Sequence, residues 1–446
     1  MQLTASGNAE LSSTVEASAF CAFMKKLFVC LAFSWCLLLL AARPARAYSV
    51  LSHQAIIDSC WLPSLQPALE RRFPGGTPAE LREAKAYAYG GGIIQDMGYY
   101  PFGSALFTDL AHYVRSGDFV RHLLEDAHDR NGYAFALGAL AHYAADIYGH
   151  ELGINKSVPL LFPKLRAAYG PVVTYEQNPL AHGRTEFAFD VLQIAAGRYR
   201  TDAYHDFIGF EVDKDLLDKA FEQTYGLKLS AIIFNVDLAL GSYRFAVRNL
   251  IPLASRAAWR ANRHELRKVN RRVRRRDYVY KESKTQFERE FGEHYERPGF
   301  GARVLAGVLQ VLPKVGKLKT LKFIAPTPEA QKLFRNSFSE TVTTYRRFLS
   351  EQTAQVGQTG DYPNVDIDTG HPSHLGEYAL ADRTYGEWLR DLAKDNFKDL
   401  PAAARQNILA FFANGTYAPI DKEEKENDNR QKTLEALARL RALPAK

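Results

Sequence analysis

Cysteine is scarce in this sequence of 446 residues, which contains only four. Three of them, Cys21, Cys30 and Cys36, lie near the N-terminus, and Cys60 is the only one that follows. One cysteine after residue 47 excludes an internal disulfide framework there, so this part must be stabilised by a hydrophobic core or by bound metal. Residues 48–446 are numerous enough for a large core, in one domain or two.

Long apolar runs are also lacking, apart from Leu27–Ala42, which is shorter than the roughly 20 residues that span a bilayer. Two lysines precede this run, and Ala45-Arg46-Ala47 follows it with small residues around a cleavage point. This order is typical of a secretory signal peptide. We therefore expect a signal peptide over 24–47 in an exported (periplasmic or secreted) protein. Residues 1–23 would then be an upstream extension, with Met24 as the true start.

The excess of positive over negative charge is small. The net charge is +7 overall and near +5 without residues 1–47, which suits an anionic substrate or membrane surface and does not demand nucleic acid. Basic residues crowd the segment Arg256–Arg276, which predicts a helix. It would either bind anionic lipid, at about 1 kcal/mol for each basic residue, or form a solvated face paired with acids. The segment lacks the pattern of interleaved aromatic residues that stacks bases, so we expect no nucleic acid partner.

Alternating, strand-like patterns are few, and helical patterns take their place. Thr77-Pro78-Ala79-Glu80 predicts a capped helix start, and we expect that helix to end at Gly90-Gly91-Gly92. Residues 93–101 then resemble a loop that contains Asp96. Further helices are expected over 104–115, 116–129 and 131–150. The predicted class is all-α, a multi-helix domain with a largely helical C-terminal extension.

The helix expected over 131–150 contains several residues of types that bind metal ions. His142, Asp146 and His150 are spaced i, i+4 and i+8, which places them along one helical face. His182 and Glu186 repeat the i, i+4 spacing. Imidazole and carboxylate groups are ligands of Zn²⁺. One such pair arises readily by chance as solvated or hydrogen-bonded groups, but two pairs, one of them extended, favour a metal site.

This order of ligands resembles the zinc-dependent phospholipase C family, whose outline the fungal zinc nucleases and glycosylphosphatidylinositol phospholipase D share. The family also uses the first residue of the mature chain, a histidine shortly after it, an upstream Asp in a loop, and a histidine some fifteen residues beyond that Asp. Cleavage after Ala47 would make Tyr48 that first residue. The matching positions are Tyr48, His53, Asp96, His112, His142, Asp146, His150, His182 and Glu186.

The match has two departures from the family. Tyr48 stands where the family usually has Trp, but the backbone amine and carbonyl would be the ligands. The spacing between the last two ligands of the central helix is shorter than in bacterial phospholipases C and resembles the phospholipase D branch. If His112 or His150 is not a ligand, His122 and His128 are the alternatives.

The resemblance covers roughly residues 48–250, which we expect to be the catalytic domain. It leaves residues 251–446 as a helical C-terminal region of unknown role. Within that region residues 361–370 are rich in acids and turn-forming residues. They lack the spacing of an EF-hand, so we expect a surface loop, with a Ca²⁺ site as the alternative.

The resemblance implies three zinc ions. One would be held by Asp96, His112, His142 and Asp146, a second by His150, His182 and Glu186, and the third by the Tyr48 amine and carbonyl, His53 and Asp146. Zinc would supply hydroxide for in-line attack on phosphorus and clamp the phosphate oxygens, and Asp96 is the candidate to orient or deprotonate the water.

The implied function is an exported zinc-dependent hydrolase of phosphate esters, phospholipase C-like, acting on phospholipid or another phosphate ester. Two alternatives remain open at this point: a zinc-dependent nuclease or phosphomonoesterase, and a non-catalytic, zinc-binding exported protein.

Overall fold

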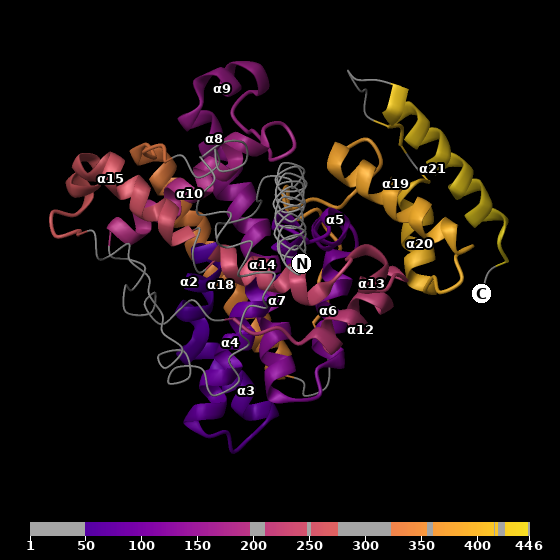
Figure 1. Cartoon of the computed structure of the whole chain (residues 1–446), viewed down its shortest axis with the longest axis horizontal. Coiled ribbons are helices and arrows are strands. Elements are labelled where there is room, and N and C mark those ends of the chain that lie inside the picture. Colours follow the sequence, from indigo (N-terminus) through magenta and orange to yellow (C-terminus); the bar gives the residue numbers. More distant parts are fainter. Residues whose placement is uncertain are drawn as a thin grey trace, which may run out of the picture. The chain divides into compact units, whose positions relative to one another are not determined.

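The computed structural model in Figure 1 describes residues 50–196, 210–247, 251–274, 323–354, 360–413, 415–417 and 424–444. All of them belong to one compact unit, Pro44–Lys446. The predicted extension 1–23, the predicted signal peptide 24–47 and Tyr48 lie outside the described residues, so those assignments stay predictions.

The predicted all-α class is confirmed. The described residues contain no β-strand, only an isolated bridge between Leu375 and Gly415. Between residues 50 and 196 the α-helices are α2 (Val50–Cys60), α3 (Gln66–Arg72), α4 (Pro78–Ile94), α5 (Ala105–Tyr113), α6 (Ser116–Asp126), α7 (Arg130–Gly149), α8 (Asn155–Leu161), α9 (Pro163–Tyr169) and α10 (Pro179–Ala195). Two π-helical turns, η1 (Trp61–Leu65) and η3 (His150–Ile154), and one 3-10 turn, η2 (Gln95–Tyr99), connect some of them.

The helices in the described part of the chain after residue 196 are α12 (Lys214–Tyr225), α13 (Leu229–Ile232), α14 (Val236–Phe245), α15 (Ile251–Val269), α18 (Pro328–Ala354), α19 (Ala379–Lys394), α20 (Ala402–Phe411) and α21 (Glu424–Ala442). Among the described residues, none of these helices is both long and apolar enough to cross a membrane.

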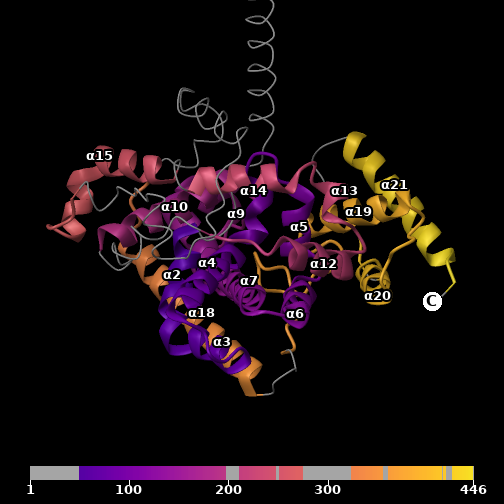
Figure 2. The ribbon, with the colours of Figure 1, turned by 60° about the horizontal axis from the view of Figure 1, so that its bottom comes forward.

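Helices α4 and α7 pack side by side, as the two views in Figures 1 and 2 agree, and α2 packs against both. The capping box predicted at Thr77 is confirmed. The Thr77 side chain accepts a hydrogen bond from the Glu80 amide at 3.3 Å, and the Thr77 amide donates to the Glu80 carboxylate at 2.7 Å.

The prediction that this helix ends at three glycines is wrong, because α4 continues through them to Ile94. Glycine costs about 1 kcal/mol relative to alanine inside a helix, but here it permits close packing. A Cβ on Gly91 would lie 1.8 Å from the carbonyl oxygen of Phe135, and one on Gly138 would lie 2.1 Å from that of Ala88. The two helix backbones therefore touch where a side chain would hold them apart.

The remaining predicted helices are present with small changes in their ends. The helix expected over 104–115 is α5, which begins after Ser104, whose hydroxyl accepts from the Phe107 amide at 3.3 Å. The helices expected over 116–129 and 131–150 are α6 and α7. The expected loop over 93–101 is instead the end of α4 followed by the 3-10 turn η2.

The C-terminal region packs on the N-terminal helices. Helix α18 lies against α7, where the Tyr345 hydroxyl donates to the Leu137 carbonyl at 2.8 Å. Helices α19 and α20 pack against each other at Tyr385, whose ring stacks on Phe411 with 3.7 Å between centroids. The domain boundary predicted at residue 250 stays a prediction, and packing contacts cross it.

The segment expected to be a surface loop, 361–370, is largely buried, so that prediction is wrong. Asp366 is 2% exposed and Asp368 is 0% exposed. Their carboxyl groups make hydrogen bonds inside the protein in place of water.

Candidate metal centre

The central part of the site comes from one face of α7 and the turn that follows it. The Nε2 of His142 lies 3.3 Å from one carboxylate oxygen of Asp146, and the Nε2 of His150 lies 4.0 Å from the other. The predicted common face is therefore confirmed. At His150 the backbone widens into the π-helical turn η3, a distortion that is frequent at functional sites.

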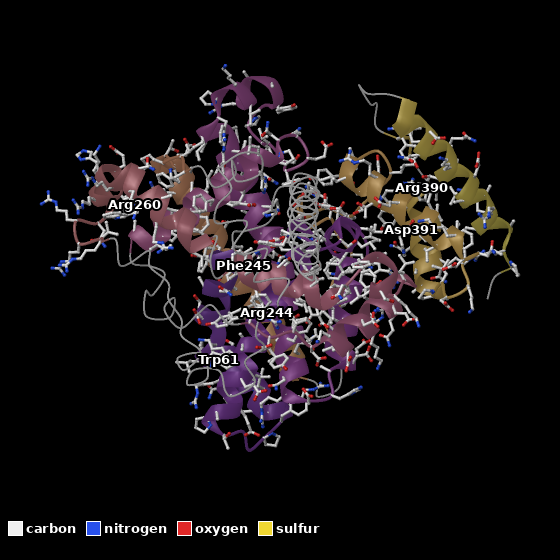
Figure 3. All side chains as sticks on the ribbon, in the orientation of Figure 1. Trp61, Arg244, Phe245, Arg260, Arg390 and Asp391 are labelled. Atoms are coloured by element: carbon white, nitrogen blue, oxygen red, sulfur yellow. The ribbon has the colours of Figure 1, made fainter. Side chains whose placement is uncertain are left out.

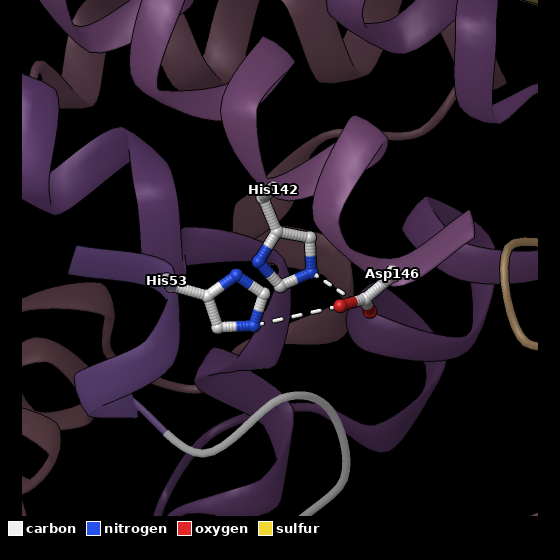
Figure 4. A group of neighbouring side chains, drawn as sticks. All are labelled: His53, His142 and Asp146. Atoms are coloured by element: carbon white, nitrogen blue, oxygen red, sulfur yellow. Dashed lines mark ion pairs between the residues drawn. The ribbon is translucent and has the colours of Figure 1, made fainter. Parts of the chain in front are cut away.

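The first group of candidate ligands consists of His53 on α2 and of His142 and Asp146 on α7, and it is drawn in Figure 4. The Nε2 of His53 lies 3.5 Å from Asp146 Oδ1, and the His53 ring stacks on that of His142 with centroids 4.3 Å apart. Two ligand atoms bound to the same tetrahedral Zn²⁺, each about 2.0–2.1 Å from it, are about 3.3–3.4 Å apart. The 3.5 Å between His53 Nε2 and Asp146 Oδ1 matches that spacing.

The second group consists of Asp96, His112 and His142. The Nε2 of His112 lies 3.5 Å from Asp96 and 3.3 Å from Asp146 Oδ2. Asp146 therefore faces histidines of both the first and the second group, and His142 belongs to both. This arrangement suits a carboxylate that bridges two ions.

Asp96 lies on η2, which is tied to α5. The Thr108 hydroxyl donates to the Gln95 carbonyl at 2.6 Å and accepts from the Gly98 amide at 2.8 Å. One threonine on α5 thus holds the turn on both sides of Asp96, on the same helix that carries His112.

The third group consists of His150, His182 and Glu186. Helix α10 presents the last two: it begins at Pro179 after Asn178, whose side chain accepts from the Ala181 amide at 2.9 Å. The Nε2 of His182 lies 2.8 Å from Glu186 Oε1, and that of His150 lies 3.6 Å from the same oxygen.

Hydrogen bonds on the far side of the rings set which nitrogen faces the centre. The Nδ1 of His112 donates to the Thr108 carbonyl at 2.8 Å, and the Nδ1 of His142 donates to the Gly92 carbonyl at 3.1 Å. A carbonyl only accepts, so Nδ1 carries a proton, and in the neutral, metal-binding form of each ring the Nε2 lone pair points at the carboxylates. Metal-binding histidines are oriented in this way.

Sequence reasoning missed the corresponding partner of His150. Its Nδ1 lies 2.8 Å from the carboxylate of Asp368, which is distant in the chain. It also missed Asp190 on α10, which accepts from the Leu51 amide at 3.3 Å and the Ser52 hydroxyl at 2.8 Å and so fixes the start of α2 beside His53. No local spacing signals either contact, because both join segments well over a hundred residues apart.

Burial and charge shift the pKa values of the cluster in different directions. Burial lowers the pKa of His53, and the neighbouring His142 lowers it further. Burial alone would lower the pKa of His112, but Asp146 and Asp96 outweigh it and raise the value to about 10. Burial and the charge of Asp146 raise the pKa of Glu186 well above its usual value.

Zinc fits this set of residues. All eight side chains are nearly inaccessible, with Glu186 the most exposed at 4%, and burying so many polar groups is costly unless each has a partner. Yet the Nε2 atoms of His112 and His142 and both oxygens of Asp146 are buried without a hydrogen bond. Cations among these atoms would satisfy them together, and imidazole with carboxylate is a donor set of zinc.

Every predicted ligand that the structure describes lies in one of the three groups, and only Tyr48 falls outside the described residues. The alternative ligands lie elsewhere. His122 bonds to the Thr224 hydroxyl at 2.8 Å, and His128 is exposed. The geometry therefore favours His112 and His150 over them.

Comparison with known proteins agrees with this centre. Residues 52–234 match the family model for zinc dependent phospholipase C. The matched stretch includes every candidate ligand from His53 to Glu186 and excludes Tyr48 and Asp368. No curated protein and no solved structure matches the chain significantly. Residues 52–234 of this chain therefore resemble the zinc-dependent phospholipase C family, a family of hydrolases.

Proposed function

We propose that this protein is an exported, zinc-dependent hydrolase of phosphate esters, and that phospholipid is its substrate. The observation that carries the proposal is that three buried groups of His and carboxylate side chains lie next to one another around Asp146, within the residues that match the family. A non-catalytic protein has no need for several adjoining groups of this kind, since one closed four-ligand site suffices for structural zinc.

The chain's own residues have distinct parts in the reaction. Asp146 stays ionised because His142 and His150 outweigh the effect of burial and hold its pKa well below the usual value. Asp96, which belongs to the second ligand group and lies 3.5 Å from the Nε2 of His112, is the residue proposed to orient the attacking water or to take its proton. Zinc held by the three groups would lower the pKa of a bound water and offset the negative charge of the phosphate.

For three ions to bind, His53 and Asp146 must be completed by the free amine of Tyr48. The contacts of Asp190 with Leu51 and Ser52 support this part of the proposal, because they hold the chain just after Tyr48 against α10. Signal-peptide cleavage after Ala47 would leave that amine a few residues from His53. Export and assembly of the metal centre would then depend on the same cleavage.

Helix α15 is the proposed contact with an anionic membrane surface. The predicted basic helix over 256–276 ends earlier, at Val269, and its last two arginines lie outside the described residues. Ala258 and Leu266 are buried, while Arg260, Arg263 and Arg267 are exposed, and the helix is kinked at Asn262. Figure 3 shows side chains that end in nitrogen extending from α15 around Arg260. Such a face would lie along anionic headgroups.

The test uses protein purified from the exported fraction. We expect about three zinc ions per chain by elemental analysis, Tyr48 as the first residue by N-terminal sequencing, and release of phosphorylated headgroup from phospholipid vesicles. Chelation should abolish the activity and added zinc should restore it. Preference for nucleic acid or for phosphomonoesters over phospholipid would refute the substrate, and one zinc ion or none would refute the enzyme class.

A further inference from the structure

A segment far along the chain, residues 363–378, lies against the helices that carry the candidate metal centre. The Tyr143 hydroxyl on α7 donates to the Pro363 carbonyl at 2.6 Å, and the Ser116 hydroxyl on α6 donates to the Val365 carbonyl at 2.6 Å. The Ile367 amide then donates to the carbonyl of His112 itself at 3.1 Å. This segment lies outside the residues that match the family.

Asp368 is the residue of this segment that reaches the centre, and its carboxylate is fully buried. One oxygen lies 2.8 Å from the Nδ1 of His150. The other accepts hydrogen bonds from the hydroxyls of Tyr113 at 2.9 Å and Tyr378 at 2.7 Å. Both oxygens therefore have partners, and only one of those partners is a histidine.

The backbone of Asp368 is held as firmly as its side chain. The Asn155 side chain donates to its carbonyl at 2.7 Å, and its amide donates to Asp366 Oδ1 at 2.8 Å. Asn155 is the first residue of α8 and directly follows the π-helical turn that starts at His150. The same stretch of chain thus fixes both the histidine and the backbone of its carboxylate partner.

An anionic acceptor at Nδ1 has two effects on an imidazole ligand. It keeps the proton on Nδ1, so that the Nε2 lone pair faces the centre, and it makes that lone pair more basic. In this protein the Nε2 of His150 faces Glu186 at 3.6 Å. His112 and His142 have only neutral carbonyls at the same position, so His150 is the one histidine of these three with a charged partner.

We propose that Asp368 is a positioning residue for the zinc ion held by His150, His182 and Glu186, so that the C-terminal region completes this part of the metal centre. The inference rests on the proposed zinc-dependent function. It gives residues 363–378 a role in metal affinity beyond packing.

The test compares zinc binding by the full-length exported protein and two matched variants, Asp368→Asn and Asp382→Asn. Asp382 is another buried carboxyl of the C-terminal region, which accepts from the Gly376 amide at 2.9 Å and belongs to none of the three ligand groups. Zinc content is measured by elemental analysis after dialysis against a series of buffered free zinc concentrations.

We expect Asp368→Asn to weaken the binding of one ion about 10–100-fold and to leave the others unchanged. Asp382→Asn should bind zinc like the wild type. In a His150→Gln background, where that site is already lost, Asp368→Asn should have no further effect on zinc binding. A binding curve of Asp368→Asn that coincides with the wild type overturns the proposal, and so does an equal loss in both Asp variants.

If Asp368→Asn does not fold, Tyr378→Phe takes its place, because it removes one hydroxyl bond to the carboxylate and leaves His150 in contact. A weaker affinity for one ion is again expected, and unchanged affinity for every ion counts against the proposal. A wild type that binds no zinc refutes the proposed function together with this inference. A wild type that binds zinc normally beside an unaffected Asp368→Asn refutes the inference alone.

Discussion

Gly91→Ala should destabilise the protein, although alanine favours helices. The added Cβ would lie 1.8 Å from the Phe135 carbonyl oxygen and 2.9 Å from the Ala139 amide nitrogen, both on the backbone of α7. Neither atom can rotate away, so α4 and α7 must separate by more than an ångström. Overpacking of this kind costs about 1–3 kcal/mol or more, against a gain of at most about 1 kcal/mol in helix propensity.

Gly92→Ala is the matched control, one residue along the same helix. Its Cβ would meet nothing closer than Ile57 Cγ1 at 3.6 Å, an ordinary contact, so only the gain of up to about 1 kcal/mol remains. We expect thermal denaturation of the zinc-loaded proteins to place Gly91→Ala several degrees below the wild type and Gly92→Ala at or above it. Gly91→Ala should also lose zinc affinity, because α4 carries the carbonyl that orients His142. Equal melting temperatures of the two variants would show that α4 and α7 do not touch through their backbones.

Three further outcomes are expected. Zinc added to the zinc-free protein at pH 7 should release protons. The pKa of His112 is raised to about 10, so at pH 7 this histidine is protonated and must lose a proton to bind zinc. Calorimetry in two buffers of different ionisation enthalpy measures the release, and its absence would contradict the prediction. Asp146→Asn should lose more than one zinc ion by elemental analysis and Glu186→Gln only one, because Asp146 faces His112, His142 and His53; equal losses would argue against a bridging carboxylate. The double variant Arg260→Ala/Arg267→Ala should bind anionic vesicles roughly 30-fold more weakly in low salt, at about 1 kcal/mol for each charge; sedimentation that matches the wild type would remove α15 from the membrane contact.

The ligands on α7 and α10 could be predicted from the sequence, because a spacing of four residues in a helix determines which side chains share a face. Asp96 and His53 have no such local signal and came from the resemblance to a family. The end of α4 was mispredicted because glycine propensity is local, whereas the close approach of Phe135 to Gly91 is a tertiary contact that overrides it.

The role of Asp368 could not be predicted for a related reason. Acidic residues among turn-forming residues usually lie on the surface, and nothing near Asp368 in the sequence indicates that Tyr113, His150 and Tyr378 surround it. Its contact with His150 spans 218 residues and its contact with Tyr113 spans 255. A single sequence carries no trace of pairs at that separation.

This separation has a consequence for the order of folding. Contacts within α7 and between α4 and α7 join segments close in the chain and can form early, whereas the contact between Asp368 and His150 must close a loop of 218 residues. The site of His150 should therefore be the last of the three to reach its final geometry. A chain that ends before residue 363 would be expected to hold the ions near Asp146 and to lack a tight site at His150. The proposed phospholipase activity would then begin only after the whole chain is made and folded, which would separate synthesis of the protein from its first turnover.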